Sequence, residues 1–400
     1  MRKNPDFELI TIENVNYLLP SGQAICDHKR GIKINETGAL IWNLADNAKT
    51  GEELIKACLD EMEISNEDAE QAGNDIGEYI NSLIQAGIFY DDDADNETQA
   101  GSVILDSPAE IKMYAAKPLR LEIAGIKINL FCDRADLDPK LLSFKSGSGN
   151  NYDSPDQTIC VIYSLPPDGD LKAPLICGSD MRIFIYENEY IISYDEYSPV
   201  KEVHMSKDGS MVTIYALKAP DLTYHLFHAI RLPFLFLAEK YNRYAIHSAS
   251  ILYKDRAWLF SAPAGTGKST HAALWNKFLD TPNINGDLNL IGIENEAPVI
   301  WGIPWCGTSE IYDNITYKLG GVIFLKRSDE DKAEQFDVPS GLVALTRRTI
   351  SPVWNTETLK NIISDLLPLA QKTYLARLYC TKEPSAQKTI QAAIDEYLIS

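Results

Sequence analysis

The sequence predicts a mixed α/β (α+β) fold built from three parts, and three observations lead to this prediction. An N-terminal segment has short extended pieces followed by three amphipathic helical patterns. A middle segment consists mainly of short alternating or apolar runs, which are typical of strands. A C-terminal segment places a glycine-rich turn between an apolar strand and a helix. The predicted boundaries are residues 1–92, an acidic linker at 93–102, a β-rich scaffold region at 103–240, and 241–400.

Composition excludes several classes of protein. The 400 residues carry a formal net charge of −20, and nucleic-acid binding needs a basic surface. No apolar run reaches the length of a membrane span, and the N-terminus lacks the apolar core of a secretory signal. The seven cysteines form no CxxC pair, which excludes an obvious zinc or redox motif. We therefore expect a cytoplasmic protein without a nucleic-acid or membrane partner, and leave homo-oligomer formation open.

The N-terminal segment has recognisable strand and helix signals. Extended pieces are expected at Phe7–Ile12, Tyr17–Leu19 and Ala24–Asp27. Helices are expected to start at Asn35, at Thr50 with Glu53, and at Ser65 with Asp68. This order, together with the segments at 34–42 and 83–89, resembles the peptide chaperone of pyrroloquinoline quinone biosynthesis. The resemblance implies a winged-helix-like domain that binds a precursor peptide as an added strand beside the third helix. A structural or dimerising domain is the alternative.

The middle segment predicts strands and one long helix. Strands are expected at Leu119–Ile123, Ile126–Phe131, Arg182–Tyr186, Tyr190–Tyr194 and Met211–Leu217. A helix is expected from Asp221 to about Lys240, kinked or broken ahead of Pro233. The histidines at 204, 225 and 228 show no partner spacing, so we assign this part a scaffold role without chemistry.

The turn at Ser261–Thr270 reads Ser-Ala-Pro-Ala-Gly-Thr-Gly-Lys-Ser-Thr and predicts a phosphate-binding loop. Backbone N–H groups converge on phosphate oxygens in such a loop, and the following helix adds a favourable dipole. Lys268 is expected to reach the terminal phosphates and the Ser269 hydroxyl to bind Mg²⁺. The nucleotide-binding residues expected are Ala264, Gly265, Thr266, Gly267, Lys268, Ser269 and Thr270. We therefore predict binding of ATP (or GTP) with Mg²⁺, although Ala262 stands where the strict motif has glycine.

Two strands expected before the loop, Ala245–Leu252 and Ala257–Ser261, should pair as an antiparallel hairpin. In the common P-loop NTPases the corresponding strand lies in a parallel unit. The hairpin, with the segments at 245–249 and 284–288, resembles the HPr serine kinase/phosphorylase family, whose nucleotide fold is shared by ATP-dependent phosphoenolpyruvate carboxykinase. The resemblance covers about residues 240–325 and implies a P-loop kinase domain of that type.

The same resemblance implies roles for individual residues. Lys268 would bind the triphosphate and Ser269 the metal. Asp287 would be a metal-site carboxylate or the base that takes the acceptor proton, with His247 beside it. The chain departs from the family at Gly286, where a second aspartate is usual, and at Thr270, where an acidic residue is common. One carboxylate therefore serves where two did, or Asn285 assists.

Two further features remain open on sequence alone. The segment Trp301–Glu310 is expected to be a rigid turn that either lines the site or packs in the core. Arg347 and Arg348 either contact phosphate oxygens or balance a helix end.

These observations together predict an ATP-dependent kinase. Its acceptor would be a Ser or Thr hydroxyl of a ribosomally made precursor peptide or small protein, docked by the N-terminal domain. Two alternatives share the same residues. One is a non-catalytic peptide-binding adaptor switched by nucleotide, and the other is a phosphatase or phosphorylase.

Overall fold

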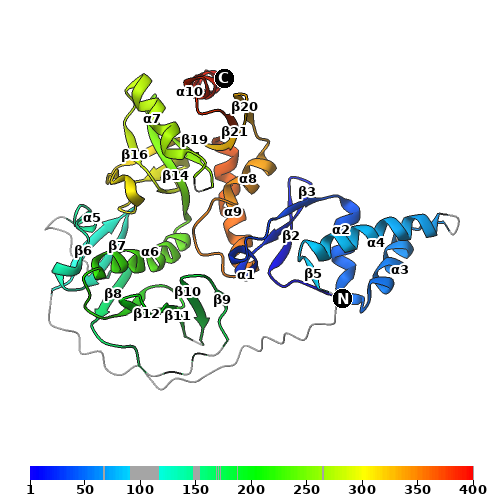
Figure 1. Ribbon diagram of the computed structural model, residues 1–400, viewed down its shortest axis with the longest axis horizontal. Helices are drawn as coiled ribbons and strands as arrows, with labels where there is room; N and C mark the ends of the chain where they lie inside the picture. Colours follow the sequence, from blue (N-terminus) through cyan, green and yellow to red (C-terminus); the bar gives the residue numbers. More distant parts are fainter. Residues whose placement is uncertain are drawn as a thin grey trace. The chain divides into compact units, whose positions relative to one another are not determined.

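A computed structural model describes residues 1–65, 68–90, 117–146, 154–167, 169, 171, 173–186, 188–263 and 265–399. The chain divides into two compact units (Figure 1). The first comprises Met1–Gly101, Leu171–Ser179 and Val353–Lys360, and the second Ser102–Asp170, Asp180–Pro352 and Asn361–Ser400. The predicted linker at 93–102 lies outside the described residues. Among the described residues, no helix combines the length and the apolar character that a membrane crossing requires.

The first unit is a small α/β domain. Its elements are β1 (Arg2–Lys3), β2 (Phe7–Ile12), β3 (Val15–Pro20), α1 (Gly22–Cys26), β4 (Ile32–Ile34), α2 (Glu36–Leu44), α3 (Gly51–Glu61), α4 (Ala69–Gln85) and β5 (Phe89–Tyr90). Strands β2, β3 and β4 form an antiparallel sheet, and β1 pairs with β5. Buried side chains from the helices and the sheet form one core, in which Leu18, Ile41 and Leu54 are fully enclosed.

Two helix starts in this unit follow the predicted caps. The Asn35 side chain accepts a hydrogen bond from Gly38 N, and Thr50 accepts one from Glu53 N. The predicted cap at Ser65 is wrong, because α4 begins at Ala69 and the Ser65 hydroxyl bonds the Asp68 carboxylate instead.

The extended piece predicted at Ala24–Asp27 is also wrong, since Gly22–Cys26 forms α1. Distant parts of the chain fix this turn. Gly22 N donates to Val353 O at 2.9 Å, and the Gln23 side chain exchanges two hydrogen bonds with the backbone of Cys177, in β9 (Ile176–Cys177). Local sequence contains neither contact, so periodicity alone predicts the wrong conformation.

The second unit begins with a sheet in the order β6-β7-β8-β13-β12-β11-β10. These strands are β6 (Leu119–Ile123), β7 (Ile126–Phe131), β8 (Gln157–Ile162), β10 (Met181–Ile185), β11 (Glu189–Tyr194), β12 (Val200–Ser206) and β13 (Met211–Ala216). A short helix, α5 (Pro139–Leu142), follows β7. Strand β8 runs parallel to both neighbours, and the other pairs are antiparallel. The strands predicted for this part are therefore present.

Helix α6 (Leu222–Lys240) connects this sheet to the rest of the unit. It packs against strands of the sheet and against β14 (Arg243–Tyr253). Of the kink or break predicted ahead of Pro233, the break is absent, because the helix continues through the proline. Buried side chains on both sides of Pro233, among them Ile230 and Phe234, stabilise the helix despite the lost backbone donor.

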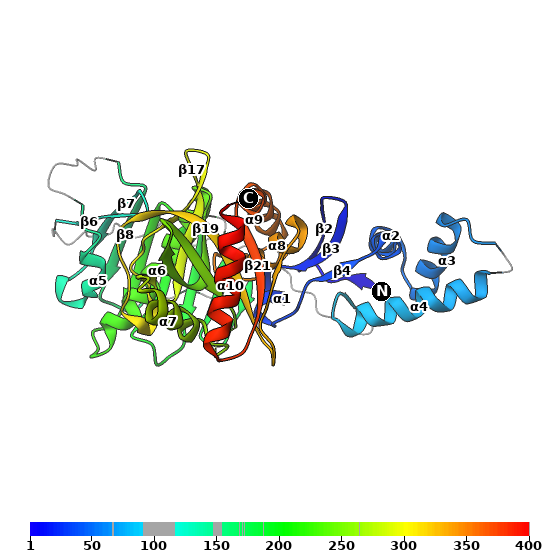
Figure 2. The same ribbon diagram turned by 90° about the horizontal axis from the view of Figure 1, so that it is seen from above.

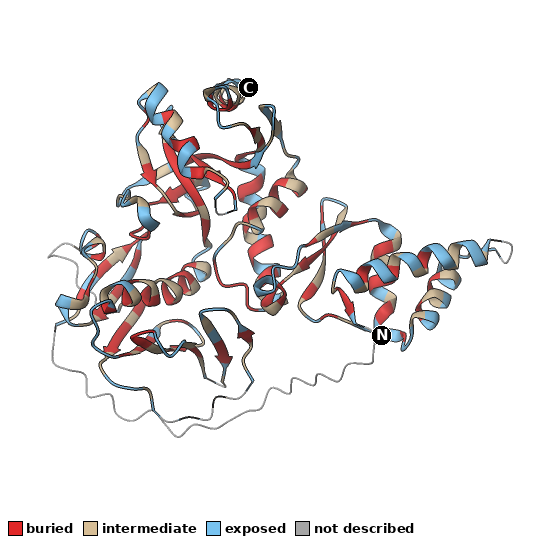
Figure 3. Ribbon diagram, in the orientation of Figure 1, coloured by how far each residue is buried: buried red, intermediate tan, exposed pale blue. Residues whose placement is uncertain are grey.

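The remaining strands of the second unit follow α6, and four of them contribute to a second core. They are β14, β15 (Arg256–Ser261), β16 (Asn283–Asn285), β17 (Leu288–Glu294), β18 (Ala297–Trp301), β19 (Thr316–Arg327), β20 (Lys332–Gln335) and β21 (Tyr374–Cys380). The helices are α7 (Lys268–Leu279), α8 (Val338–Thr346), α9 (Thr356–Lys372) and α10 (Pro384–Tyr397). Helices α7 and α10 share an apolar core with β14, β15, β19 and β21; Figure 2 shows α10 alongside β21, and Figure 3 shows β14 buried along most of its length.

The two longest strands each take part in two ladders. Residues 243–247 of β14 pair with β17, and residues 248–253 pair with β15. Strand β19 pairs with β18 at 316–318 and with β15 and β21 beyond that point. The predicted antiparallel hairpin is confirmed, and β15 also gains a parallel neighbour in β19. As a result, β14, β17, β18, β19 and β15 close into a ring.

Candidate functional site

The candidate site lies where β14 changes partners. His247 is the last residue paired with β17, opposite Leu288, and Ser248 is the first paired with β15, opposite Ser261. Ser248 N also donates to Asp287 O at 2.9 Å. Because Ser261 begins the glycine-rich turn, three adjacent strands bring that turn, His247 and Asp287 to one place.

Two glycines give the glycine-rich turn a left-handed backbone with open space around it. Gly265 and Gly267 adopt φ of +73° and +115°, a region that L side chains avoid, and a Cβ on either would meet no neighbour within 4 Å. Gly267 also caps α7, whose first turn has no side-chain cap. The N-terminal amides of α7 are therefore open to an anion. Ser269 and Thr270 are exposed in this first turn.

Lys268 is the most buried cation of the site, with 9% of its surface exposed. Its Nζ donates to Ala262 O at 3.1 Å, at the base of the turn. Burial lowers the pKa of Lys268, the nearby Asp287 carboxylate opposes this, and the Arg348 guanidinium lowers it further. A cation held with one carbonyl as partner can exchange that bond for a phosphate oxygen.

The Asp287 carboxylate accepts a hydrogen bond from His247, whose Nδ1 lies 3.2 Å from Oδ1 of the carboxylate. This hydrogen bond lowers the pKa of Asp287 more than burial raises it, and the charges of Arg231 and Lys268 lower it further. Asp287 is therefore ionised at neutral pH, and about a third of its side chain remains exposed (34%). The three residues to which sequence reasoning gave catalytic roles, His247, Lys268 and Asp287, lie together.

The backbone around Asp287 is fixed by Asn285. Its Oδ1 accepts from Asp287 N at 3.0 Å and Leu288 N at 3.2 Å, and its Nδ2 faces the carbonyls of Ile303 and Trp305. Asn285 is buried, and its carboxamide is committed to these bonds. It therefore positions Asp287, in place of the assisting role suggested from sequence.

Gly286, which stands where a second aspartate was expected, has no space for a side chain. A Cβ at Gly286 would lie 2.2 Å from Ser309 Oγ and 2.3 Å from Ser309 Cβ. Gly307 is also closely packed, since a Cβ there would lie 2.8 Å from Cγ of Asp287. Gly307 and Ser309 both belong to the segment Trp301–Glu310, which includes a short 3₁₀ turn (Gly307–Ser309). This segment therefore forms the wall against which Asp287 packs.

The same segment also packs in the core, which confirms one of its two predicted roles. Trp305 is 1% exposed, and its indole N–H donates to Phe227 O of α6 at 3.0 Å. Its ring lies 4.9 Å from Phe234 and 5.8 Å from Phe227. Trp305 thereby ties α6 to the wall beside Asp287.

Sequence reasoning missed two residues of α6 that interact electrostatically with Asp287. Arg231 lowers the pKa of Asp287. The Asp287 carboxylate in turn favours higher pKa values for His228 and Arg231. Burial, with Arg231, lowers the pKa of His228 to about 4, so this imidazole is neutral. The available signal was an arginine within an otherwise apolar helix, three residues after a histidine.

Arg348 approaches the site from the segment after α8. His247 N donates to Arg348 O at 3.2 Å, and the neighbouring Thr349 bridges to Ile246 of β14. The Arg348 guanidinium is partly buried and acts on Lys268. Arg347 is exposed. Of the two arginines singled out from sequence, Arg348 belongs to the site.

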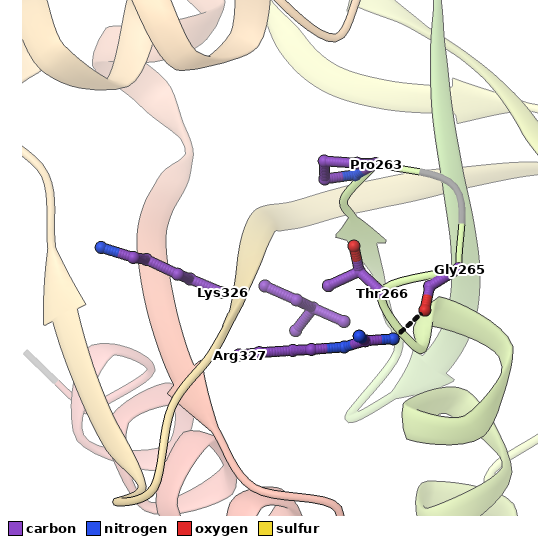
Figure 4. A pocket seen from close by; sticks show the side chains of 6 residues that line it. Pro263, Gly265, Thr266, Lys326 and Arg327 are labelled. Atoms are coloured by element: carbon purple, nitrogen blue, oxygen red, sulfur yellow. Dashed lines mark hydrogen bonds between the residues drawn. The ribbon is translucent and has the colours of Figure 1, made fainter.

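A pocket of about 340 Å³ lies between the turn and the end of β19, lined by Pro263, Gly265, Thr266, Leu325, Lys326 and Arg327 (Figure 4). The Arg327 guanidinium, at the end of β19, donates to Gly265 O. Arg327 was not predicted, because only the parallel pairing of β15 with β19 brings it to the turn.

The donor chemistry for a metal ion is limited. Within the ranges that the structure describes, no group of three or more His, Cys, Asp or Glu side chains is arranged to hold one. The Asp287 carboxylate and the exposed hydroxyl of Ser269 are the donors predicted for a metal ion near the glycine-rich turn. Mg²⁺ fits such a set, because it keeps several waters and shares its ligands with substrate phosphates. Ala264, predicted to contact nucleotide, lies outside the described residues.

Comparison with known proteins identifies one domain. Residues 22–88 match the protein-family model described as coenzyme PQQ synthesis protein D (PqqD), so the first unit contains a PqqD domain, as the N-terminal resemblance predicted. No curated protein matches the chain. Among solved structures, the chain is similar to the Hpr(Ser) kinase/phosphatase from Coxiella burnetii, with a TM-score of 0.23 and 9% identity over 39% of this chain and 96% of that one.

Proposed function

We propose that this chain is an ATP- and Mg²⁺-dependent kinase that phosphorylates a Ser or Thr hydroxyl of a ribosomally made precursor peptide. One observation carries the proposal: the open glycine-rich turn with Lys268 lies beside an ionised carboxylate, Asp287, that is held by His247. Phosphoryl transfer needs this combination of a phosphate cradle, a cation and a group that orients the acceptor.

The first unit supports the choice of acceptor. Its PqqD domain fits the precursor-peptide recognition that the sequence resemblance implies. An extended peptide can add to an edge strand of the sheet β2-β3-β4 through main-chain hydrogen bonds. The catalytic site then needs little sequence selectivity of its own, because the bound peptide is already at high local concentration.

The chemistry assigned to the site is a single displacement. The acceptor oxygen forms a bond to the γ-phosphorus, and the bond from that phosphorus to the bridging oxygen breaks, leaving its electron pair on ADP. Lys268 and the turn amides bind the phosphates, and Asp287 orients the hydroxyl and receives its proton. Ser269 and Asp287 would hold Mg²⁺, which neutralises phosphate charge when bound.

The test is a transfer assay on precursor peptides encoded beside the gene, followed by mass spectrometry. Wild-type protein with Mg·ATP should add one phosphoryl group, located on Ser or Thr. Lys268→Ala should abolish transfer while peptide binding persists, and Asp287→Asn should stop transfer without loss of nucleotide binding. Lys277→Ala, on the same helix, and Asp280→Asn, at its C-cap where asparagine is well tolerated, are matched controls.

Two other outcomes decide against a kinase. Unmodified peptide whose affinity changes with nucleotide would identify an adaptor. Phosphate release from a phosphorylated peptide, without forward transfer, would identify a phosphatase.

A further inference from the structure

One face of helix α6 carries two residues that interact electrostatically with Asp287. Tyr224, His228 and Arg231 follow the spacing i, i+4, i+7, so they project from one side of the helix. The rings of Tyr224 and His228 lie 4.5 Å apart. Both His228 and Arg231 interact electrostatically with Asp287. The helix therefore forms a second wall of the site, provided by a part of the chain that sequence reasoning assigned to scaffold.

The position of this wall is fixed by Trp305. Its indole N–H bonds α6 at Phe227 O, in the turn that precedes Arg231. Two residues further along the same segment, Gly307 packs directly against Asp287. The segment Trp301–Glu310 therefore contacts both α6 and Asp287, which keeps the helix that carries Arg231 close to the carboxylate.

Arg231 interacts electrostatically with Asp287 but forms no bond to any residue that the structure describes. The side chain is partly buried, and in the described part of the chain no hydrogen bond or ion pair joins its guanidinium. A guanidinium withdrawn from water without a partner is costly, and its five N–H donors match the oxygens of a phosphoryl group. Asp287 interacts with Lys268 as well as with Arg231, so the carboxylate is a common neighbour of both cations.

We propose that Arg231 is a catalytic residue that binds the phosphoryl group while it passes from ATP to the acceptor. The inference rests on the proposed function and extends it to the acceptor side. As the acceptor oxygen bonds to phosphorus and the bond to the ADP oxygen breaks, charge spreads over the three remaining oxygens, and Arg231 donates to them. The proton still goes to Asp287. Lys268 binds the same group from the nucleotide side.

The experiment compares Arg231→Gln and Arg231→Lys with wild type. Two rates are measured with Mg·ATP: transfer to the peptide that accepts phosphate in the assay above, and phosphate release to water without peptide. For Arg231→Gln we expect kcat to fall about 10²–10³-fold with little change in ATP affinity by calorimetry. Arg231→Lys should regain part of the rate, because lysine restores the charge without the planar fork.

The matched control is Arg256→Gln. Arg256 is exposed at the start of β15, at the end of the strand opposite the glycine-rich turn, so this variant should keep the wild-type rate. Thermal melting of all variants, and rescue of Arg231→Ala by added guanidinium ion, separate a catalytic role from a structural one. Rescue is expected for Arg231→Ala alone.

The outcomes separate the two proposals. If wild type neither transfers nor releases phosphate, the proposed function fails and this inference fails with it. If wild type is active and Arg231→Gln stays within about threefold of its kcat, only the role of Arg231 is overturned. A melting point that falls together with the rate, without guanidinium rescue, also overturns it.

Discussion

Asp287 is held by three neighbours of different chemistry. His247 binds one carboxylate oxygen, Asn285 binds the backbone, and Gly307 packs against the side chain. These contacts restrict the carboxylate oxygen, the backbone and the side chain of Asp287 separately, so together they favour one orientation of the carboxylate. The pair with His247 also keeps it ionised, which suits a group that must accept a proton or contact a cation.

The tight packing of Gly286 leads to a prediction at this scale. Gly286→Ala places a Cβ against Ser309, so the Trp301–Glu310 segment must shift. We expect the free energy of unfolding to fall by about 1–3 kcal/mol and transfer to slow, since Asp287 moves with the segment. Urea unfolding measures the first effect and the transfer assay the second.

The control for this prediction is a double variant. Ser309→Gly removes both atoms that the new Cβ would meet, so Gly286→Ala with Ser309→Gly should be less destabilised than the sum of the single variants. Strict additivity of the two changes would contradict the steric account.

Some residues of this site can be predicted from the sequence and others cannot. Lys268, His247 and Asp287 belong to short motifs, and the structure brings those motifs together through the pairing of β14 with β15 and β17. Arg231 and Arg327 have no motif, because their contribution depends on packing of α6 and on the parallel pairing of β19. Tertiary neighbours of this kind leave little local signal.

Helix α6 shows what periodicity predicts about an element and what it does not. Its extent follows the sequence prediction closely, yet the expected break at Pro233 is absent because packing holds the helix on both sides. Glu239, near the end of α6, is a second residue that the sequence pattern does not explain, because it places a carboxyl group in a buried position. Its Oε1 is buried and has no hydrogen-bond partner within the described residues, and burial raises the pKa of its carboxyl to about 9.

This carboxyl predicts a pH dependence of stability. In the unfolded chain a glutamate has a pKa of about 4.3. Between that pH and about 9, the folded chain therefore holds a proton on Glu239 that the unfolded chain releases. The free energy of unfolding is therefore highest below the pKa of the unfolded chain, and it falls as the pH rises toward the pKa of Glu239 in the folded chain. Glu239→Gln cannot ionise, so it should be more stable than wild type by about 1–3 kcal/mol at pH 8 and should match it at pH 4.

Urea unfolding across this pH range measures the difference. Glu396→Gln, an exposed change of equal charge in α10, should leave the profile unaltered. Parallel profiles for wild type and Glu239→Gln would show that Glu239 is not protonated in the folded chain.

At the scale of the whole molecule, sequence order conceals how the chain is grouped. The first unit includes Leu171–Ser179 and Val353–Lys360, far from the PqqD domain in sequence. Gly22 and Gln23 depend on these segments for their backbone bonds. Composition and periodicity predict the elements of this unit well, but they carry no information on such long-range additions.

The proposed function assigns different tasks to the two units and therefore predicts a tethering effect. A precursor peptide that carries both its recognition segment and its acceptor should be phosphorylated at low concentration. When the two pieces are supplied separately, we expect KM for the acceptor piece to rise about 10²–10⁴-fold while kcat changes little. Steady-state assays with intact and split peptide check this. Equal KM values would show that the acceptor site recognises its substrate alone.

The most direct test of the account is the binding of Mg·ATP to the full chain by titration calorimetry. Wild type should bind one nucleotide, and Lys268→Ala should bind it at least about tenfold more weakly, because the buried cation beside the glycine-rich turn is lost. Absence of heat from wild type with both ATP and GTP, or equal affinity of the two proteins, would contradict it.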